Sequence, residues 1–416
     1  MNVKCINTPV AQSRIEPLVS ADAASTPTVE LGPTIRILRT AAEFEELRGA
    51  WTAWGGHLHS DIDFLSMLIE SREEILNPHI IVVYRDAKPD AMLIGRLERA
   101  QINFKVGYLP LFKARARSLT FQYGALRGNP SDENCKEIIR AILRSLKSGE
   151  ADMALLDHPS TDSFLYKRAL SVPSLLSRDY LPAPQPHHKM RLPGTIEEVF
   201  LGLSSSHRKD LRAGGRKIEK KLEGRLKICC FREVAELEVA ISQVEEVARK
   251  TYHRGLGVGF DDSPRTRQML RFYARNGQLR MYVVYDADTP FAFWIGVVYG
   301  GWFYSDHTGY DSHYRDYAPG TFLLTKMIED FCREGLQGID FGLGDALYKQ
   351  RFGNYHFEES PVFLFAPHWK GLTLKIAHSI TGVAGRAMKE MLSRTNLLMK
   401  VKSWWRGRLA QKGASQ

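Results

Sequence analysis

The chain has 416 residues, a length that predicts two or three domains rather than one. Hydrophobic residues make up 44% of it and charged residues 25%, which excludes collagen-like, coiled-coil and wholly disordered chains. The net charge of +10 is concentrated in two segments. Residues 370–416 hold ten lysines and arginines against one acid, and residues 204–227 hold nine against three. The remaining chain is mildly acidic, so we expect no nucleic-acid partner.

The five cysteines form no C-x-x-C pair and no zinc-type cluster with histidine. We therefore expect no disulfide framework, no metal site and a reducing, cytoplasmic compartment. Residues 1–33 lack the apolar segment of a secretory signal and are expected to be a flexible leader. The longest apolar run, Phe291–Tyr299, suits a buried strand, so we expect no transmembrane helix.

Residues 34–172 are predicted to form one α+β unit. A strand over 34–40 is followed by a helix over 41–55, in which Phe44, Leu47, Trp51 and Trp54 lie on one face. The other expected elements are helices over 64–75, 131–147 and 162–170 and strands over 79–84, 91–99, 118–123 and 153–156.

Residues 173–193 contain five prolines and two adjacent histidines, which favours an extended linker. Residues 194–367 are predicted to form a second unit, and residues 368–416 a basic tail. The expected helices of the second unit cover 196–201, the basic segment after Ser204, 237–253, 263–275 and 321–334. Its expected strands cover 279–285, 292–299, 302–307 and 339–343, and a hairpin at Gly300-Gly301 joins two of them.

The two units end alike. Residues 152–157 and 164–168 parallel residues 339–345 and 346–350, at an offset of about 180–190 residues. This similarity predicts a tandem duplication within a mixed α/β fold. Chance similarity between two amphipathic segments is the alternative.

The segment from Tyr310 to Leu324 leaves a strand, passes through a turn that contains Gly320 and enters a helix. Backbone N–H groups and the positive end of the helix dipole at such a turn suit a pyrophosphate. An ordinary helix start with Pro319 in its first turn is the alternative.

Three motifs carry a resemblance to a known family. Arg315-x-x-Ala318-x-Gly320 resembles the acyl-CoA pyrophosphate loop of GNAT acetyltransferases, in which glycine occupies the position of Ala318. Residues 340–353 resemble the closing motif Gly-Asp-x-x-Tyr-Lys-x-x-Phe/Trp-Gly of the CelD/BcsL type, a GNAT-like family of cellulose and exopolysaccharide biosynthesis, and residues 204–219 resemble its arginine-rich helix.

The resemblance implies tandem GNAT-like domains, each a mixed, mostly antiparallel sheet flanked by helices, with the active site in the second domain and a non-catalytic first domain. It also implies acyl-CoA as co-substrate, held by Arg315, Ala318, Gly320 and Thr321. Tyr348 is then the acid that protonates the leaving thiolate. Packing of Tyr348 beside Phe352 is the alternative.

The base is expected on the strand before the turn. Alternation over 302–308 places Asp306 and His307 on opposite faces, and both are candidates. We favour Asp306, because burial of a strand-end carboxylate raises its pKa toward neutrality. A solvated aspartate is the alternative.

Substrate-binding candidates come from three places. Arg208, Arg212 and Arg216 recur every four residues, so one helix face can pair with phosphates of CoA or of an activated sugar, although a solvated face explains the same pattern. His253 lies in a glycine-rich loop that resembles an acceptor-side lid, with a flexible connection as the alternative. The closing motif adds Asp345 and Lys349.

The tail combines Trp404-Trp405 with basic residues. Such a pattern favours an anionic membrane surface, while partner binding and a disordered tail remain open. The apolar residues at near-helical spacing are Ile376, Ile380, Val383, Met388, Met391 and Leu392.

Together these observations predict an acyl-CoA-dependent N- or O-acyltransferase that acts on a sugar or sugar nucleotide in extracellular polysaccharide or cellulose synthesis. We expect it in the cytoplasm or at the inner face of the membrane. One alternative is a Fem-like enzyme that transfers an aminoacyl group from charged tRNA to a cell-wall precursor. The other is a non-catalytic accessory protein that docks a polysaccharide synthase through its tail.

Overall fold

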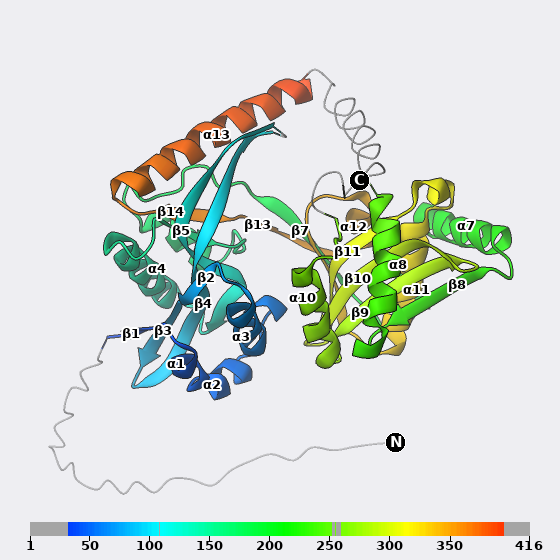
Figure 1. Ribbon diagram of the computed structural model, residues 1–416, viewed down its shortest axis with the longest axis horizontal. Coiled ribbons are helices and arrows are strands. Elements are labelled where there is room, and N and C mark those ends of the chain that lie inside the picture. The colour runs from blue at the N-terminus through cyan, green and yellow to red at the C-terminus, as the bar shows by residue number, and fades with distance from the viewer. Residues whose placement is uncertain (1–31, 108, 252–253, 255–258, 395–416) are drawn as a thin grey trace, which may run out of the picture. The chain divides into compact units, whose positions relative to one another are not determined.

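Two sheets organise the described residues, which are 32–107, 109–251, 254 and 259–394 of the computed structural model (Figure 1). Sheet A has the strand order β1-β3-β4-β5-β6-β14, with β2 paired to β4. Its strands are β1 (Thr34–Leu38), β2 (Ile75–Pro78), β3 (Ile80–Arg85), β4 (Lys88–Val106), β5 (Leu109–Gly128), β6 (Met153–Leu156) and β14 (Val362–Phe365).

Sheet B has the strand order β13-β7-β12-β11-β10-β9-β8. Its strands are β7 (Gln185–Arg191), β8 (Leu226–Phe231), β9 (Leu279–Asp286), β10 (Thr289–Tyr299), β11 (Trp302–Tyr310), β12 (Gly338–Leu343) and β13 (Tyr355–Glu359). The predicted hairpin at Gly300-Gly301 is confirmed by the pairing of Tyr299 with Trp302.

Helices flank both sheets. Those of the first half are α1 (Ala41–Glu45), α2 (Arg48–Ala53), η1 (Leu58–Ser60), α3 (Ile62–Ser71), α4 (Asp132–Lys147) and α5 (Phe164–Ser171). Those of the second half are α6 (Ile196–Gly202), α7 (Ser205–Lys221), η2 (Val234–Glu236), α8 (Leu237–Arg249), α10 (Pro264–Arg275), η3 (Ser312–Tyr317), α11 (Pro319–Arg333) and α12 (Leu347–Phe352), followed by α13 (Trp369–Arg394).

The same arrangement occurs in both halves. In the first, β5 and β6 are parallel and α4 connects them; in the second, β11 and β12 are parallel and α11 connects them. The other paired strands are antiparallel. The predicted fold class, a mixed α/β fold in tandem halves, is confirmed.

The halves exchange strands, which corrects the expected boundaries. Residues 185–191, expected within a linker, form β7, which pairs with β12 and β13 inside sheet B. Conversely, β14 follows the second half in sequence but pairs with β6 in sheet A. Local composition did not indicate this exchange, because proline is tolerated near strand ends and the pairing partners lie far away in sequence.

The long hairpin β4–β5 also exceeds the expected strands over 91–99 and 118–123. Its outer part alternates polar and apolar residues and packs against α13: Phe104 and Ala116 share a buried cluster with Leu374. The helix therefore covers part of sheet A, rather than forming a separate tail.

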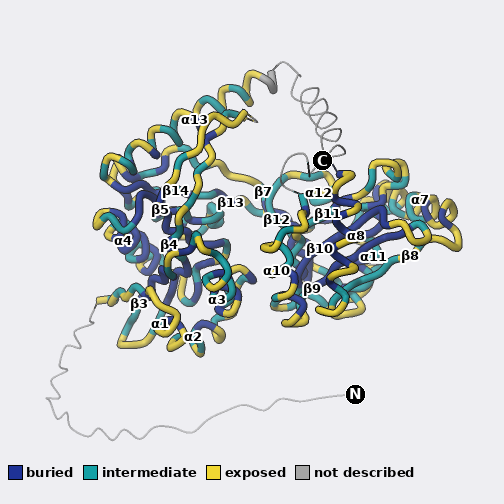
Figure 2. Tube along the Cα trace, in the orientation of Figure 1, coloured by how far each residue is buried: buried dark blue, intermediate teal, exposed yellow. Residues whose placement is uncertain are grey.

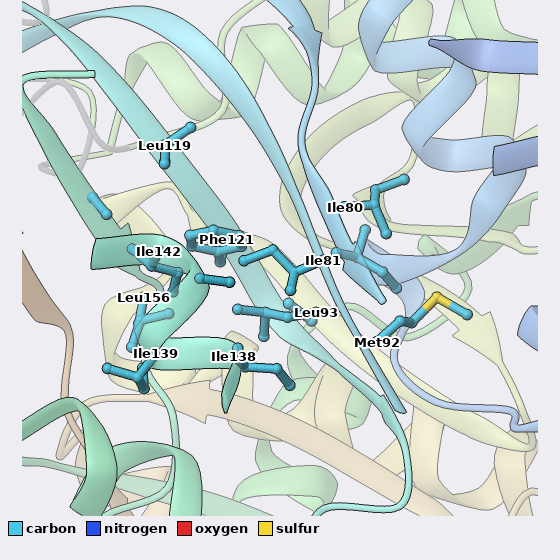
Figure 3. Close-up of a cluster of buried hydrophobic side chains, with 14 of the residues drawn as sticks. Ile80, Ile81, Met92, Leu93, Leu119, Phe121, Ile138, Ile139, Ile142 and Leu156 are labelled. Atoms are coloured by element: carbon cyan, nitrogen blue, oxygen red, sulfur yellow. The ribbon is translucent and has the colours of Figure 1, made fainter. Parts of the chain in front are cut away.

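The cores follow the sheets. In sheet A, strand residues such as Ile81, Leu93 and Phe121 meet Ile138 and Ile142 of α4 (Figure 3). Sheet B has two core faces, one covered by α8 and α10 and the other by α7 and α11. Buried residues line the strands of both sheets, while the α13 surface alternates in exposure (Figure 2).

Helix starts match the sequence signals. Ser131 caps α4, and Ser263 caps α10 with Pro264 in its first turn. Within the described residues no helix, α13 included, is long and apolar enough to cross a membrane. The described residues do not include positions 1–31 of the expected leader, nor His253, Trp404 and Trp405.

Candidate functional site

A split between two parallel strands forms the centre of the site. The pairing of β11 with β12 runs from Trp302 with Gly338 to Tyr304 with Asp340 and then stops, although both strands continue. On its other edge β12 pairs with β7 along its whole length, from Gly338 to Leu343. The split exposes backbone groups of both strands, which a ligand can use.

A β-bulge lies at the split. Ile295 pairs with His307 and Gly296 with Ser305, so Asp306 is the extra residue of β11. Gly296 is required there, because a Cβ at this position would lie 2.4 Å from the Tyr304 carbonyl oxygen.

The bulge corrects the predicted alternation. Asp306 lines a cavity together with Tyr273 of α10, and His307 meets Phe260, which belongs to the same core face. The two side chains are therefore on one face, with His307 Nε2 3.6 Å from Asp306 Oδ1. The expected burial of Asp306 is also wrong, since 45% of its side chain is exposed.

The turn predicted to hold the acyl-CoA donor, residues 315–321 and below called the donor turn, has an unusual backbone. Ala318 precedes α11 in the left-handed conformation (φ 47°), and Pro319 is the first helical residue. The N–H groups of Thr321 and Phe322 both donate to the Ala318 carbonyl, 3.0 Å away, so the turn uses some of its donors internally. The first turn of α11 contains no acidic residue. Space is open at Gly320, where an added Cβ would meet only Tyr310 at 3.8 Å.

Tyr348 lies on the α11 face of sheet B. Its ring packs edge-on against Trp294 and Phe341, with centroids 5.5 and 5.8 Å away. Trp294 in turn donates from Nε1 to Ser305 Oγ, 2.9 Å away, beside the bulge. Tyr348 is therefore placed near the split by aromatic neighbours that a phenylalanine could also contact.

The neighbours of Tyr348 in the closing motif have local partners. Lys349 Nζ donates to the Leu343 carbonyl, 2.7 Å away, and burial lowers the pKa of this amine. Asp345 is exposed and accepts a hydrogen bond from Gln350. Both fix the conformation of the segment after β12.

Several basic side chains of helix α7 already contact other parts of the chain. Arg208 donates to the carbonyls of α6's last turn, at 2.6 Å from Leu203 O, and Arg212 lies over the Phe200 ring. Lys217, which the sequence analysis did not select, donates to the Asp316 carbonyl of η3, 3.1 Å away. Positive charge of α7 is thus held beside the donor turn.

A cavity of about 330 Å³ opens at the split on the face of sheet B opposite α11 and Tyr348. Its lining includes Tyr304, Ser305 and Asp306 of β11 and Asp340 and Gly342 of β12. The first half contributes further polar side chains, which are His57, His59, Tyr123, Asp157 and His158. Burial lowers the pKa values of His57 and His59, which favours neutral imidazoles there.

A buried charge cluster joins the two halves beside this cavity. His187 contacts Asp340 through Nε2 (2.6 Å) and Glu359 through Nδ1 (2.8 Å), and all three side chains are at most 5% exposed. Tyr123 of β5 donates to Glu359, 2.7 Å away, and Lys189 lies 2.9 Å from Asp340.

The charges of this cluster stabilise one another. Burial by itself lowers the pKa of His187, but the hydrogen bonds with Asp340 and Glu359 outweigh it and raise this pKa. Burial by itself raises the pKa of Asp340, but His187 and Lys189 lower it. The neighbouring charges therefore favour the protonated form of His187 and the ionised form of Asp340.

An adjacent aspartate–histidine pair follows β6. His158 Nδ1 lies 2.6 Å from Asp157 Oδ1, and His158 has a left-handed backbone (φ 49°). Sequence reasoning missed both His158 and His187. The internal repeat was the available signal, because it matched the segment ending at Asp157 with the catalytic-motif segment ending at Asp345.

Comparison with known proteins identifies the fold of the site. Residues 205–350 match a family model described as an acetyltransferase (GNAT) domain. No curated protein matches in sequence. The chain is similar to the crystal structure of FemX at 12% identity and a TM-score of 0.51, covering 80% of this chain and 97% of that one.

Two further solved structures are similar at lower scores. They are L-PGS from Bacillus licheniformis (11% identity, TM-score 0.45, 84% and 99% coverage) and a tandem GNAT protein from the clavulanic acid biosynthesis pathway (13%, 0.44, 80% and 98%). The family match covers the strand split, the donor turn and Tyr348. Residues 205–350 therefore form a GNAT acetyltransferase domain, whose donor class is acyl-CoA, and the protein is an acyltransferase.

Proposed function

We propose that this protein transfers an acyl group from acyl-CoA to an amine or hydroxyl of a sugar or sugar nucleotide in extracellular polysaccharide or cellulose synthesis. The strand split between β11 and β12 carries the proposal, because it has the donor turn on one face and a polar cavity on the other. The resemblance of residues 340–353 to the CelD/BcsL closing motif supports the polysaccharide acceptor.

The donor would bind with its phosphates at the start of α11. That helix end offers a positive dipole without an acidic side chain, and Lys217 of α7 adds charge beside it. Arg315, Ala318, Gly320 and Thr321 form this turn, and Arg216 extends the basic face of α7.

In the reaction, the acceptor nitrogen or oxygen attacks the thioester carbonyl carbon, and the tetrahedral oxyanion collapses with loss of the CoA thiolate. Backbone N–H groups at the bulge of β11 can stabilise the oxyanion, and Tyr348 can protonate the thiolate. Asp306 remains the predicted base, and His253, Asp345 and Lys349 remain predicted substrate-binding residues.

Titration calorimetry with acetyl-CoA tests the donor site. Wild-type protein should bind, and Gly320→Val should bind more weakly, because the added methyls crowd the approach of phosphates to the turn. The protein itself has room for the change and valine has a higher helix propensity than glycine, so the melting temperature should not fall. Gly49→Val is the matched control, since Gly49 also occupies the second position of a helix with open space around it. Equal affinity of Gly320→Val and wild type would contradict the donor turn.

A Fem-like aminoacyl transfer is the second candidate. The similarity to FemX spans both halves of this chain, which favours a shared arrangement of domains. The donor distinguishes the two functions: release of free thiol from acetyl-CoA in the presence of glucosamine supports the first, and transfer from charged tRNA without thiol release supports the second.

We also propose that α13 brings the protein to an anionic membrane surface. Ile376, Ile380 and Val383 lie on one helix face and are 56–64% exposed. The opposite face packs on sheet A through Leu374. The charge of residues 370–416 favours acidic lipids by roughly 1 kcal/mol for each basic residue at the surface.

Vesicle co-sedimentation tests this proposal. Because Leu374 is part of a buried cluster, deletion from residue 370 would also damage the fold, so we choose substitutions. The triple change Ile376→Ser, Ile380→Ser and Val383→Ser should reduce sedimentation with phosphatidylserine vesicles, and salt should release the wild type. Val239→Ser, on the exposed face of α8, is the control. Equal binding to phosphatidylcholine vesicles would contradict it.

A further inference from the structure

The first half contains a second strand split. The parallel pairing of β5 with β6 ends at Phe121 and Leu156, and both chains then diverge, as β11 and β12 do. A cavity of about 270 Å³ occupies this split. Its lining combines Phe121, Leu126, Leu156 and Leu165 with hydrogen-bonding side chains such as Gln122, Tyr123, Ser160 and Ser163.

The helix that connects β5 to β6, α4, does not start with a turn that suits a phosphate. The first turn of α4 carries Asp132 and Glu133, which pair with Arg168 and Arg85. Negative side chains repel an anion from the helix end that would otherwise attract it. The described lining of the cavity contains carboxylates of Asp157 and Glu359 and no lysine or arginine. This combination fits an uncharged or cationic ligand with an apolar face and several hydroxyls.

His158 lies where this cavity meets the cavity of about 330 Å³ at the split between β11 and β12. His57, Tyr123, Asp157 and His158 line both cavities. Only 21% of the His158 side chain is exposed, and Asp157 holds its Nδ1 at 2.6 Å. With the proton on Nδ1, the other ring nitrogen, Nε2, has a lone pair that can accept a proton.

We propose that the first half binds the acceptor, a neutral or amino sugar, in its strand-split cavity, and that His158, oriented by Asp157, is the base of acyl transfer. The proposal rests on the acyl transfer proposed above and replaces Asp306 in the role of base. Asp306 is more exposed, and among the described residues its one ion-pair partner is His307, at 3.6 Å.

The step is balanced within these groups. The acceptor nitrogen or oxygen forms a bond to the thioester carbon while its proton passes to His158 Nε2. The carbon–sulfur bond then breaks, and the thiolate takes the proton of Tyr348. The imidazolium returns its proton to Tyr348 through solvent, which restores both groups.

Several titratable groups face His158 across the two cavities, and any pH profile reports on them together. They are His57 and His59 before and within η1, Tyr123 on β5, Asp157 beside His158, Tyr273 on α10, Tyr304 and Asp306 on β11, and His187, Asp340 and Glu359 of the buried cluster.

The test is N-acetylation of glucosamine by the full-length protein with acetyl-CoA, measured as thiol release over pH 5–9. His158→Gln should lower kcat about 10²–10⁴-fold and remove the acidic limb of the pH profile. Its affinity for acetyl-CoA, measured by calorimetry, should stay the same. Asp157→Asn should also lower kcat. Glucosamine 6-phosphate should have a higher KM than glucosamine, because the cavity lining carries no positive side chain. His368→Gln, a histidine near Asp152 outside both cavities, is the control.

Two results would overturn the inference and leave the proposed function standing. One is an unchanged kcat in His158→Gln while wild type binds acetyl-CoA and transfers its acyl group. The other is an acidic limb that disappears in Asp306→Asn and persists in His158→Gln. Failure of the wild type to bind acetyl-CoA would instead overturn the proposed function.

Discussion

The two strand splits of the molecule have the same topology and opposite electrostatics. Each lies between parallel strands connected by a helix, β5 and β6 by α4 and β11 and β12 by α11. The start of α4 carries two acids, whereas the start of α11 carries none and has Lys217 nearby.

This difference shows how one fold can serve two binding roles. The backbone of each split offers the same groups, and the first turn of the connecting helix decides whether an anion is attracted there. In the proposed function, these few side chains direct the phosphate-bearing donor to the second half and a neutral or cationic partner to the first.

The largest expected effect compares a tyrosine pair. Tyr348 and Tyr166 occupy the same Leu-Tyr-Lys position in the two halves. Tyr348→Phe should lower kcat about 10²–10⁴-fold with little change in acetyl-CoA affinity, because it loses a proton donor and keeps its ring contacts. Tyr166→Phe should keep kcat. Loss of thermal stability with an unchanged rate in Tyr348→Phe would assign that residue to packing.

The next effect concerns the cluster that joins the halves. His187→Gln removes the cation between Asp340 and Glu359 and leaves Lys189 beside Asp340 alone, which should lower the free energy of unfolding by about 3–5 kcal/mol. His188→Gln, whose ring lies 3.6 Å from the exposed Asp345, should cost less. Urea titrations of the three proteins measure both.

The same cluster predicts a pH dependence with a definite sign. The pKa of His187 is higher in the folded state, so its contribution is complete below the unfolded value of about 6.5 and is lost as pH rises through the folded value. The pKa of Asp340 is lower in the folded state, so its contribution is lost as pH falls through that value. Wild-type stability should therefore fall above neutral pH more steeply than that of His187→Gln; parallel curves would contradict this.

A smaller effect makes the second half resemble the first. Thr321→Asp introduces an acid in the first turn of α11, as Asp132 does in α4. Repulsion of about 1 kcal/mol should weaken acetyl-CoA binding about fivefold, while the helix itself is not destabilised. Thr321→Asn has the same shape without the charge and should bind normally. Calorimetry at low ionic strength measures the acetyl-CoA affinity of both variants. Equal affinities would show that an acid in the first turn of α11 does not repel the donor.

The smallest effect concerns the backbone of the donor turn. Ala318 adopts φ 47°, which costs an L-residue about 1–2 kcal/mol relative to glycine. Ala318→Gly should therefore raise the free energy of unfolding by about 1 kcal/mol in urea titrations. Ala346→Gly, at φ −77°, should lower stability instead. A loss of stability in both would show that Ala318 is not strained.

Local signals determined much of this protein from sequence alone. Apolar periodicity, caps such as Ser263 and turns such as Gly300-Gly301 depend on neighbouring residues, so the main helices and strands, the tandem order and the acyltransferase class were predictable. The predictions for the donor turn and for Tyr348 could be made because their residues form short continuous motifs.

Contacts between distant residues were decided only by the tertiary structure. His187 meets Asp340 and Glu359 across 153 and 172 residues, and β14 enters a sheet built from the other half of the chain. The bulge at Asp306 arises where Gly296 allows β11 to approach β10 closely, so simple alternation placed His307 on the wrong face. The sequence thus determined the elements and the donor chemistry, because these depend on local backbone and side-chain preferences. The tertiary structure alone decided which side chains line the two cavities, because strand pairing brings them together from separate halves of the chain.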